Sequence, residues 1–144
     1  MAYSTISKPS LHFNTKLYTG NASTQAITGV GFQPDWTWIK NRSTTNSHVL
    51  TDAVRGVDKT LITNSNGAEN AGSTNIGSFD SDGFTLGSNG GTNGSGNSVV
   101  SWNWKAGTGQ GSSNTDGSIN TTYTSVNTTA GFSISSYTGT GSAG

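Results

Sequence analysis

The sequence predicts an all-β protein, an antiparallel β-sandwich with little helix. Two strand-like segments each carry a pair of tryptophans at alternate positions, Trp36-Thr37-Trp38 and Trp102-Asn103-Trp104. Because side chains alternate across a strand, both tryptophans of a pair point to one face. Other short β-prone runs are separated by glycine-rich turns, and no apolar period of 3.6 residues is sustained. We expect a sandwich, since a sheet face this apolar has to be covered by a second sheet.

The composition is that of a neutral, glycine-rich domain. The 144 residues are about one domain long, and seven basic residues balance seven acidic ones. Nucleic acid and anionic membrane surfaces call for clustered Lys and Arg, which this chain lacks. It has no cysteine, which excludes a disulfide scaffold, and no run near the roughly 18 apolar residues of a membrane span. We therefore expect no nucleic-acid partner and no membrane insertion.

The expected elements follow in chain order. Residues 1–11 are polar and contain Pro9, so they are interpreted as an N-terminal arm. The turn Asp80-Ser81-Asp82-Gly83 closes a hairpin, because Asp-Gly supplies the positive φ of a tight reversal. Residues 64–74 and 87–97 are glycine- and asparagine-rich loops, where we expect any ligand to bind. Strands are expected at residues 13–19, 24–30, 36–39, 48–54, 60–63, 76–79, 84–86 and 98–105.

The end of the sequence repeats an early strand. The segment Phe132-Ser-Ile-Ser-Ser-Tyr137-Thr-Gly139 matches Phe13-Asn-Thr-Lys-Leu-Tyr18-Thr-Gly20 in phenylalanine, tyrosine, threonine and glycine. The match predicts a β-sandwich module over residues 12–130, followed at 131–144 by a closing strand or by the start of a second repeat. In the second case we expect the chain to be the N-terminal portion of a longer protein with modules in series.

Aromatic residues are the expected core. We assign six of them to the interior: Trp36, Trp38, Trp102, Trp104, Phe79 and Phe84. The alternative for the tryptophans is a sugar-stacking surface, because an indole offers a flat apolar face and an N–H donor.

Few residues are arranged for catalysis or metal binding. Hydrolysis of a glycosidic bond needs two carboxylates about 5–10 Å apart, and the only close pair in the sequence is Asp80 and Asp82. In a tight turn such residues ordinarily cap the backbone, with a calcium site as the alternative, although the other ligands of an EF-hand loop are missing. His12 and His48 are too few and too separated for a zinc cluster. We expect no catalytic residue, no cofactor, and no metal site beyond the candidate ligands Asp80 and Asp82.

Five segments, taken in order, resemble a known module. They are Phe13–Asn21, Gly29–Trp36, Trp38–Lys40, Ser78–Gly87 and Trp102–Gly107. The module recurs in structural proteins of marine tailed phages, particularly cyanophages. The resemblance implies a concanavalin-like jelly roll, similar to lectin and glucanase sandwiches, and a location in the virion. It supplies no catalytic or ligand residues.

The resemblance and the residues together favour a non-enzymatic structural protein. We expect a module of a phage fibre, spike or surface appendage that attaches to other virion proteins and to copies of itself. A lectin-like module that binds host-surface glycan and a capsid decoration protein are the alternatives. A glycan-degrading enzyme comes after these, because paired carboxylates are missing outside the Asp80–Asp82 turn.

Overall fold

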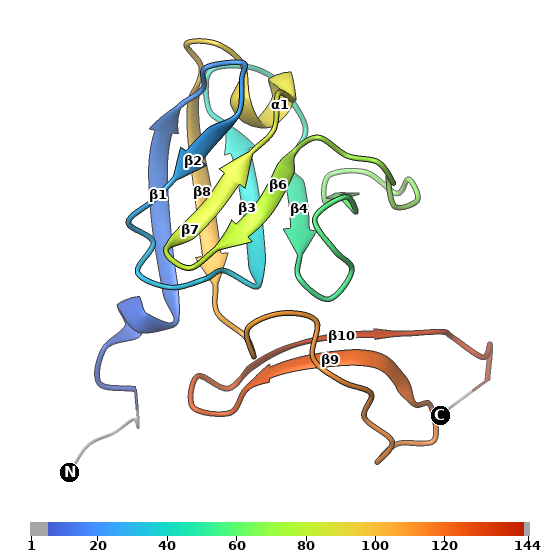
Figure 1. Ribbon diagram of the computed structural model, residues 1–144. Helices are drawn as coiled ribbons and strands as arrows, with labels where there is room; N and C mark the ends of the chain where they lie inside the picture. Colours follow the sequence, from blue (N-terminus) through green and yellow to red (C-terminus); the bar gives the residue numbers. More distant parts are fainter. Residues whose placement is uncertain (1–5, 143–144) are drawn as a thin grey trace.

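The computed structural model describes residues 6–142 and shows two packed β-sheets with a separate hairpin beneath them (Figure 1). A five-stranded sheet has the order β1-β8-β3-β4-β5, and a three-stranded sheet has the order β2-β7-β6. All the strand pairs are antiparallel. The elements are the 3-10 helix η1 (Pro9–Leu11), β1 (Phe13–Thr19), β2 (Gln25–Ile27), β3 (Trp36–Asn41), β4 (Val49–Asp52), β5 (Leu61–Ile62), β6 (Ile76–Asp80), β7 (Gly83–Leu86), α1 (Gly90–Asn93), β8 (Ser98–Trp104), β9 (Thr121–Asn127) and β10 (Phe132–Tyr137).

The predicted all-β sandwich with little helix is confirmed. Each expected strand is present, although those expected at 24–30 and 48–54 shorten to β2 and β4. Three elements were not predicted. One is the 3-10 helix η1 within the expected arm, another is the single helical turn α1 inside the loop 87–97, and the third is β9, which pairs with β10.

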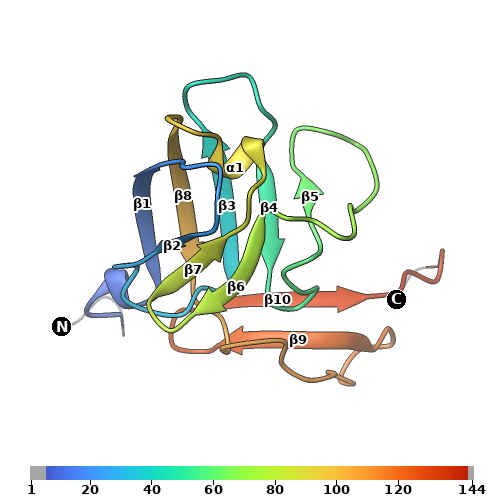
Figure 2. The ribbon, with the colours of Figure 1, turned by 45° about the horizontal axis from the view of Figure 1, so that its top comes forward.

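The core lies between the five-stranded and three-stranded sheets. Figure 2 shows how these two sheets face each other. Phe84 is fully buried in the core, and Phe79 packs against it from a partly buried position. Its buried members come from both sheets: Ile27, Ile39, Val49, Ile76, Phe84, Leu86 and Val99.

The assignment of Trp36, Trp38, Trp102 and Trp104 to the core is wrong. All four are only partly buried, and they alternate with fully buried Thr37, Ile39 and Asn103 along β3 and β8. The tryptophans therefore point away from the three-stranded sheet. We call this side of the five-stranded sheet the outer face.

Hydrogen bonding explains why polar residues occupy the inner face instead. The Thr37 hydroxyl donates to Asn103 Oδ1 at 3.2 Å, and Asn103 Nδ2 donates to Ser101 Oγ and to the Asn14 carbonyl, each at 3.1 Å. A buried polar group is tolerated when it is paired in this way. The interior at this end of the sandwich is thus a closed polar network, and the bulky indoles go outside.

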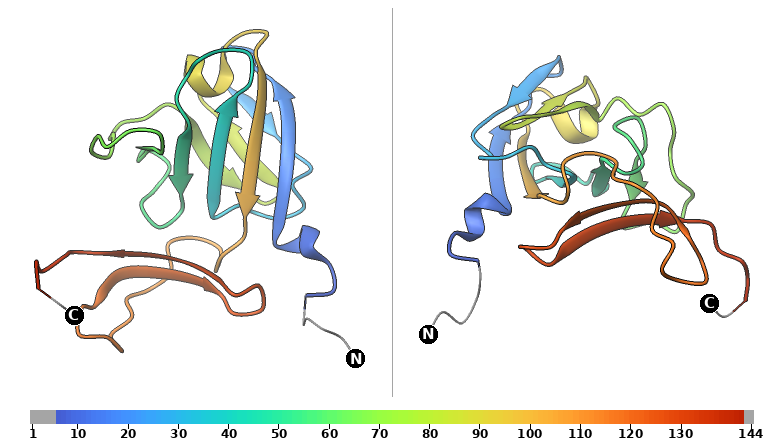
Figure 3. Two further views of the ribbon diagram at one scale, coloured as in Figure 1. Left: turned by 180° about the vertical axis from the view of Figure 1, so that it is seen from behind. Right: turned by 60° about the horizontal axis from the view of Figure 1, so that its bottom comes forward.

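The β9–β10 hairpin crosses the lower end of the sandwich, transverse to its strands (Figure 3). The expected boundary between residues 130 and 131 falls in the turn that joins these two paired strands. Of the expected arm, residues 1–5 lie outside the described residues, and the rest includes η1. No helix within residues 6–142 is long and apolar enough to cross a membrane.

Candidate interaction surface

The outer face carries an apolar surface built in three rows across β1, β8 and β3. The lowest row contains Phe13, Trp104 and Trp36, the middle row Thr15, Trp102 and Trp38, and the upper row Leu17, Val100 and Lys40. Ring centroids are 4.7 Å apart for Phe13–Trp104 and for Trp36–Trp104, and 5.3 Å apart for Trp38–Trp102. Directly opposed side chains in a sheet pack in this way. The upper row ends on β1 at Leu17, which is 65% exposed.

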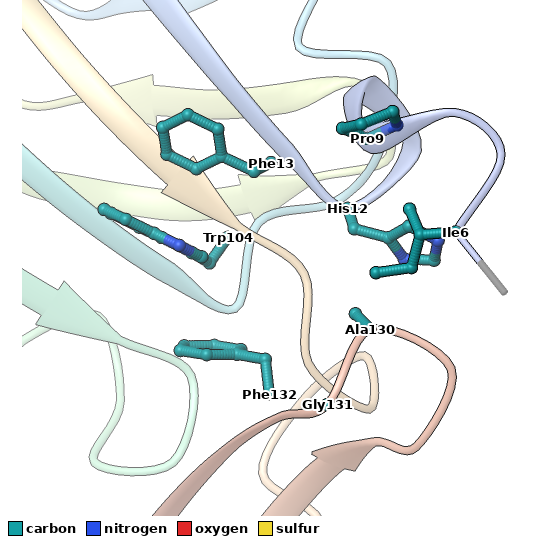
Figure 4. Close-up of a pocket in the computed structure, with 8 residues that line it drawn as sticks. All are labelled: Ile6, Pro9, His12, Phe13, Trp104, Ala130, Gly131 and Phe132. Carbon is teal, nitrogen blue, oxygen red and sulfur yellow. The ribbon is translucent and has the colours of Figure 1, made fainter. Parts of the chain in front are cut away.

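The β9–β10 hairpin covers the lowest row. Phe132, at the start of β10, stacks on Trp36 with a centroid distance of 5.6 Å and an interplanar angle of 13°, and lies 6.4 Å from Trp104. Trp104 is therefore held between Phe13 and Phe132 (Figure 4). Packing of the hairpin on the sandwich thus depends on Trp36 and Trp104, two of the tryptophans that were expected in the core.

Asp35 ties the chain between β8 and β9 to the sandwich. Its buried carboxylate accepts hydrogen bonds from the backbone N–H groups of Ala106 at 2.7 Å, Thr108 at 3.0 Å and Gly109 at 2.6 Å. Thr108 has a φ of 65°, which is uncommon for a residue other than glycine. Three donors converging on one carboxylate hold this strained turn in place, and so set where the hairpin begins.

Three clefts follow one another along β10, between the hairpin and the lower end of the sandwich. The first has a volume of about 530 Å³ and lies beside Phe13, Trp104 and Phe132, with Pro9 and His12 on its other side (Figure 4). The second, of about 280 Å³, lies between Trp36 and Leu50 on one side and residues 132–135 on the other. The third, of about 370 Å³, lies between Val54, Leu61 and residues 134–137. We call this series the β10 groove.

The candidate metal ligands Asp80 and Asp82 have structural partners. Asp80 accepts from the hydroxyls of Ser78 and Thr85, each at 2.7 Å. Asp82 accepts from the backbone amides of Gly31 at 2.6 Å and Gly29 at 2.9 Å, and these bonds lower its pKa. Within the described part of the chain, no three His, Cys, Asp or Glu residues are grouped to hold a metal ion.

The two loops proposed for ligand binding do meet. A cleft of about 430 Å³ is lined by Asn70, Ser73 and Thr74 from the first loop and by Asn89 and Gly91 from the second. Its lining is rich in amides and hydroxyls, in contrast to the aromatic rows of the outer face.

The two histidines and the only glutamate of the sequence, Glu69, have other contacts. Glu69 forms an ion pair with Arg55 at 2.9 Å, and the same guanidinium contacts Asp52 at 2.6 Å. His12 Nδ1 lies 3.1 Å from Asn127 Nδ2, whereas the His48 ring lies 6.2 Å from Trp38. The histidines therefore belong to two different surroundings.

A family model described as a domain of unknown function, DUF7483, matches residues 8–144. The chain belongs to this family. No curated protein and no solved structure matches it. The DUF7483 match runs from the residue before η1 through β10, so it includes the hairpin together with the sandwich.

Sequence reasoning missed two parts of this DUF7483 surface. The strand β9 has a signal in its β-prone run Thr121-Thr-Tyr-Thr-Ser-Val-Asn127. The role of Asp35 has no comparable signal, because its three donors come from residues about seventy positions later in the chain.

Proposed function

We propose that this chain is a non-enzymatic module of a phage virion appendage, which acts by attachment to other virion proteins and to copies of itself. The observation that carries the proposal is the outer face, where Leu17 and the Trp38–Trp102 pair remain partly exposed beside the hairpin. A contiguous apolar face of this kind marks an interaction surface. The resemblance of five segments to a module of phage structural proteins supports the proposed location in a virion.

Cryo-electron microscopy of particles that encode this chain tests the proposal. Density for the sandwich in a projecting fibre or at its root is the expected result, with the outer face against a neighbouring protein. Density spread over the capsid shell would replace the appendage by a decoration protein. Absence of the polypeptide from purified particles would refute a virion function.

A second candidate is a lectin-like module for a host-surface glycan, and the position of the tryptophans favours it. Trp38 and Trp102 are accessible on the outer face, and Trp38 Nε1 donates to Thr63 Oγ1 at 3.1 Å. Aromatic faces flanked by hydroxyls suit a neutral sugar, since the apolar ring face stacks and the polar rim hydrogen-bonds.

A glycan array followed by calorimetry separates this candidate from attachment alone. Binding that is lost in Trp102→Ala and kept in Asn70→Ala would place the sugar on the outer face, whereas the reverse pattern would place it in the loop cleft. An array with no binder counts against the lectin candidate and leaves the attachment proposal standing.

A further inference from the structure

The edge strand β1 uses alternate residues to bind its neighbour β8. The His12 carbonyl accepts from Lys105 N, and Gly20 N donates to the Asn97 carbonyl, each at 2.9 Å and in the register of the β1–β8 ladder. Hydrogen-bonded pairs alternate along an antiparallel ladder. The backbones of residues 14, 16 and 18 therefore also bond to β8, and those of residues 13, 15 and 17 face the open edge of the sheet.

The strand β10 bonds to its neighbour β9 through the opposite set of alternate residues. Thr124 of β9 exchanges both backbone hydrogen bonds with Ser112, at 3.2 and 2.7 Å, so its backbone points away from β10. The alternate residues of β9 then bond to residues 132, 134 and 136 of β10. The N–H and C=O groups of Ser133 and Ser135 are left at the open edge, and both residues are exposed.

Matching the two strands by sequence identifies what this edge is suited to bind. With Phe132 set against Phe13, and Tyr137 against Tyr18, Ser133 and Ser135 match Asn14 and Lys16. These are the residues through which β1 bonds to β8. We propose that the open edge of β10 accepts the β8 strand of a second copy of this module, where β10 takes the place beside β8 that the second copy's own β1 otherwise holds.

The surroundings of the matched tyrosines agree with a missing partner. Tyr18 packs edge-on against Phe84, with ring centroids 6.5 Å apart, and its hydroxyl donates to the Thr92 carbonyl at 2.9 Å. Tyr137 is 64% exposed. A second module placed on β10 as the sandwich is placed on β1 would cover this ring.

The β10 groove has room for the side chains of the incoming strand. In the β1–β8 ladder Trp104 faces Phe13, and Trp102 faces Thr15. In the same register on β10, the incoming tryptophans face Phe132 and Ile134, which line the clefts of about 530 and 280 Å³. Main-chain pairing at an open edge combined with side-chain pockets is the recognition mode of strand addition.

This inference names the partner for the proposed attachment function and rests on that function for its biological setting. The strand-addition inference and the proposed attachment function can be refuted independently of each other. Strand addition is a property of the isolated chain in solution, whereas the location of the chain in a particle is decided by microscopy.

The test uses the full chain and a fluorescent synthetic peptide with the sequence of residues 96–105. We expect saturable binding by fluorescence anisotropy. Ser135→Pro should weaken it at least about tenfold, because proline removes the edge N–H and is tolerated at an exposed strand edge. The matched control is Thr19→Pro on the open edge of β1, an exposed position outside the three rows of the outer face, and this variant should bind the peptide as the parent chain does. A peptide with both tryptophans replaced by serine should not bind.

Register is tested by hydrogen exchange and by cross-linking. The peptide should protect the amides of Ser133 and Ser135 and leave that of Leu17 unprotected. Because the chain has no cysteine, S135C should form a disulfide with a peptide that carries cysteine at position 101 faster than with one that carries it at 99 or 103.

Three outcomes overturn the proposal. They are no binding, binding unaffected by Ser135→Pro, and protection of Leu17 in place of Ser133 and Ser135.

Discussion

Replacing Asp35 by alanine tests how firmly the hairpin is joined to the sandwich. The substitution leaves the Ala106 amide unpaired, and an unsatisfied buried donor costs about 1–3 kcal/mol. The amides of Thr108 and Gly109 are less buried and can bond to water, so each loses only the net value of its hydrogen bond, roughly 1 kcal/mol. The expected fall in the free energy of unfolding is therefore about 3–5 kcal/mol.

Urea unfolding followed by tryptophan fluorescence measures this change, and limited proteolysis shows whether residues 107–113 are released. Asp35→Asn keeps one acceptor oxygen and should fall between the parent chain and Asp35→Ala. The control is Asp58→Ala, since that side chain is 58% exposed and its ionic contact with Lys59 is a long 3.9 Å. A loss below about 1 kcal/mol in Asp35→Ala, or one equal to that of the control, would refute the role assigned to the three amides.

Three further predictions concern the sandwich. Amide hydrogen bonds from Gly31 and Gly29 lower the pKa of Asp82, so its contribution to stability is present above about pH 4 and is lost as the pH falls further. In Asp82→Asn the urea midpoint should therefore fall less steeply with decreasing pH than in the parent chain. An unchanged dependence of the midpoint on acid pH would contradict this. Burial raises the pKa of Tyr18, so the folded state loses stability as the pH rises above about 10, and Tyr18→Phe should remove part of that loss. At neutral pH the same variant lacks the hydrogen bond to the Thr92 carbonyl and should lose about 1 kcal/mol of unfolding free energy, measured by thermal or urea unfolding. Gly83 has a φ of 148°, and a Cβ there would overlap the Ile27 carbonyl oxygen, so Gly83→Ala should strongly lower the melting temperature. The control Gly90→Ala should not, because the space around Gly90 is open. Equal melting temperatures for the two variants would show that the β2–β7 contact can adjust.

The strands were predictable because their signals are local. The Asp80–Gly83 turn fixes the β6–β7 hairpin, and the alternation around Trp36 and Trp102 marks β3 and β8. Which face of those strands is buried was not predictable from the same pattern. Alternation gives two candidate faces, and the choice depends on whether Thr37 and Asn103 find hydrogen-bond partners across the sheet. Those partners are known only once the sheet order is known.

The candidate surface was also predictable only in the part that rests on local sequence. The match between β10 and β1 is visible in the sequence, and it already suggests a strand with a repeated role. That β10 leaves open the edge that β1 uses depends on the bridge between Ser112 and Thr124, which is a tertiary contact. The clefts beside β10 likewise exist only because Asp35 and Phe132 position the hairpin under the sheet.

The zero net charge bears on how such a module would assemble. With no net charge there is no overall charge to steer association, so encounters between free copies should proceed near the unsteered rate of about 10⁵–10⁶ M⁻¹s⁻¹. Two modules joined in one chain, or held side by side in a particle, meet instead at an effective concentration in the mM range. The apolar rows and the open strand edge act only at short range. They fix how two strands align once they touch, and they attract partners little from a distance. They suit partners that are already neighbours, and this is the condition that an appendage built from repeated modules would provide.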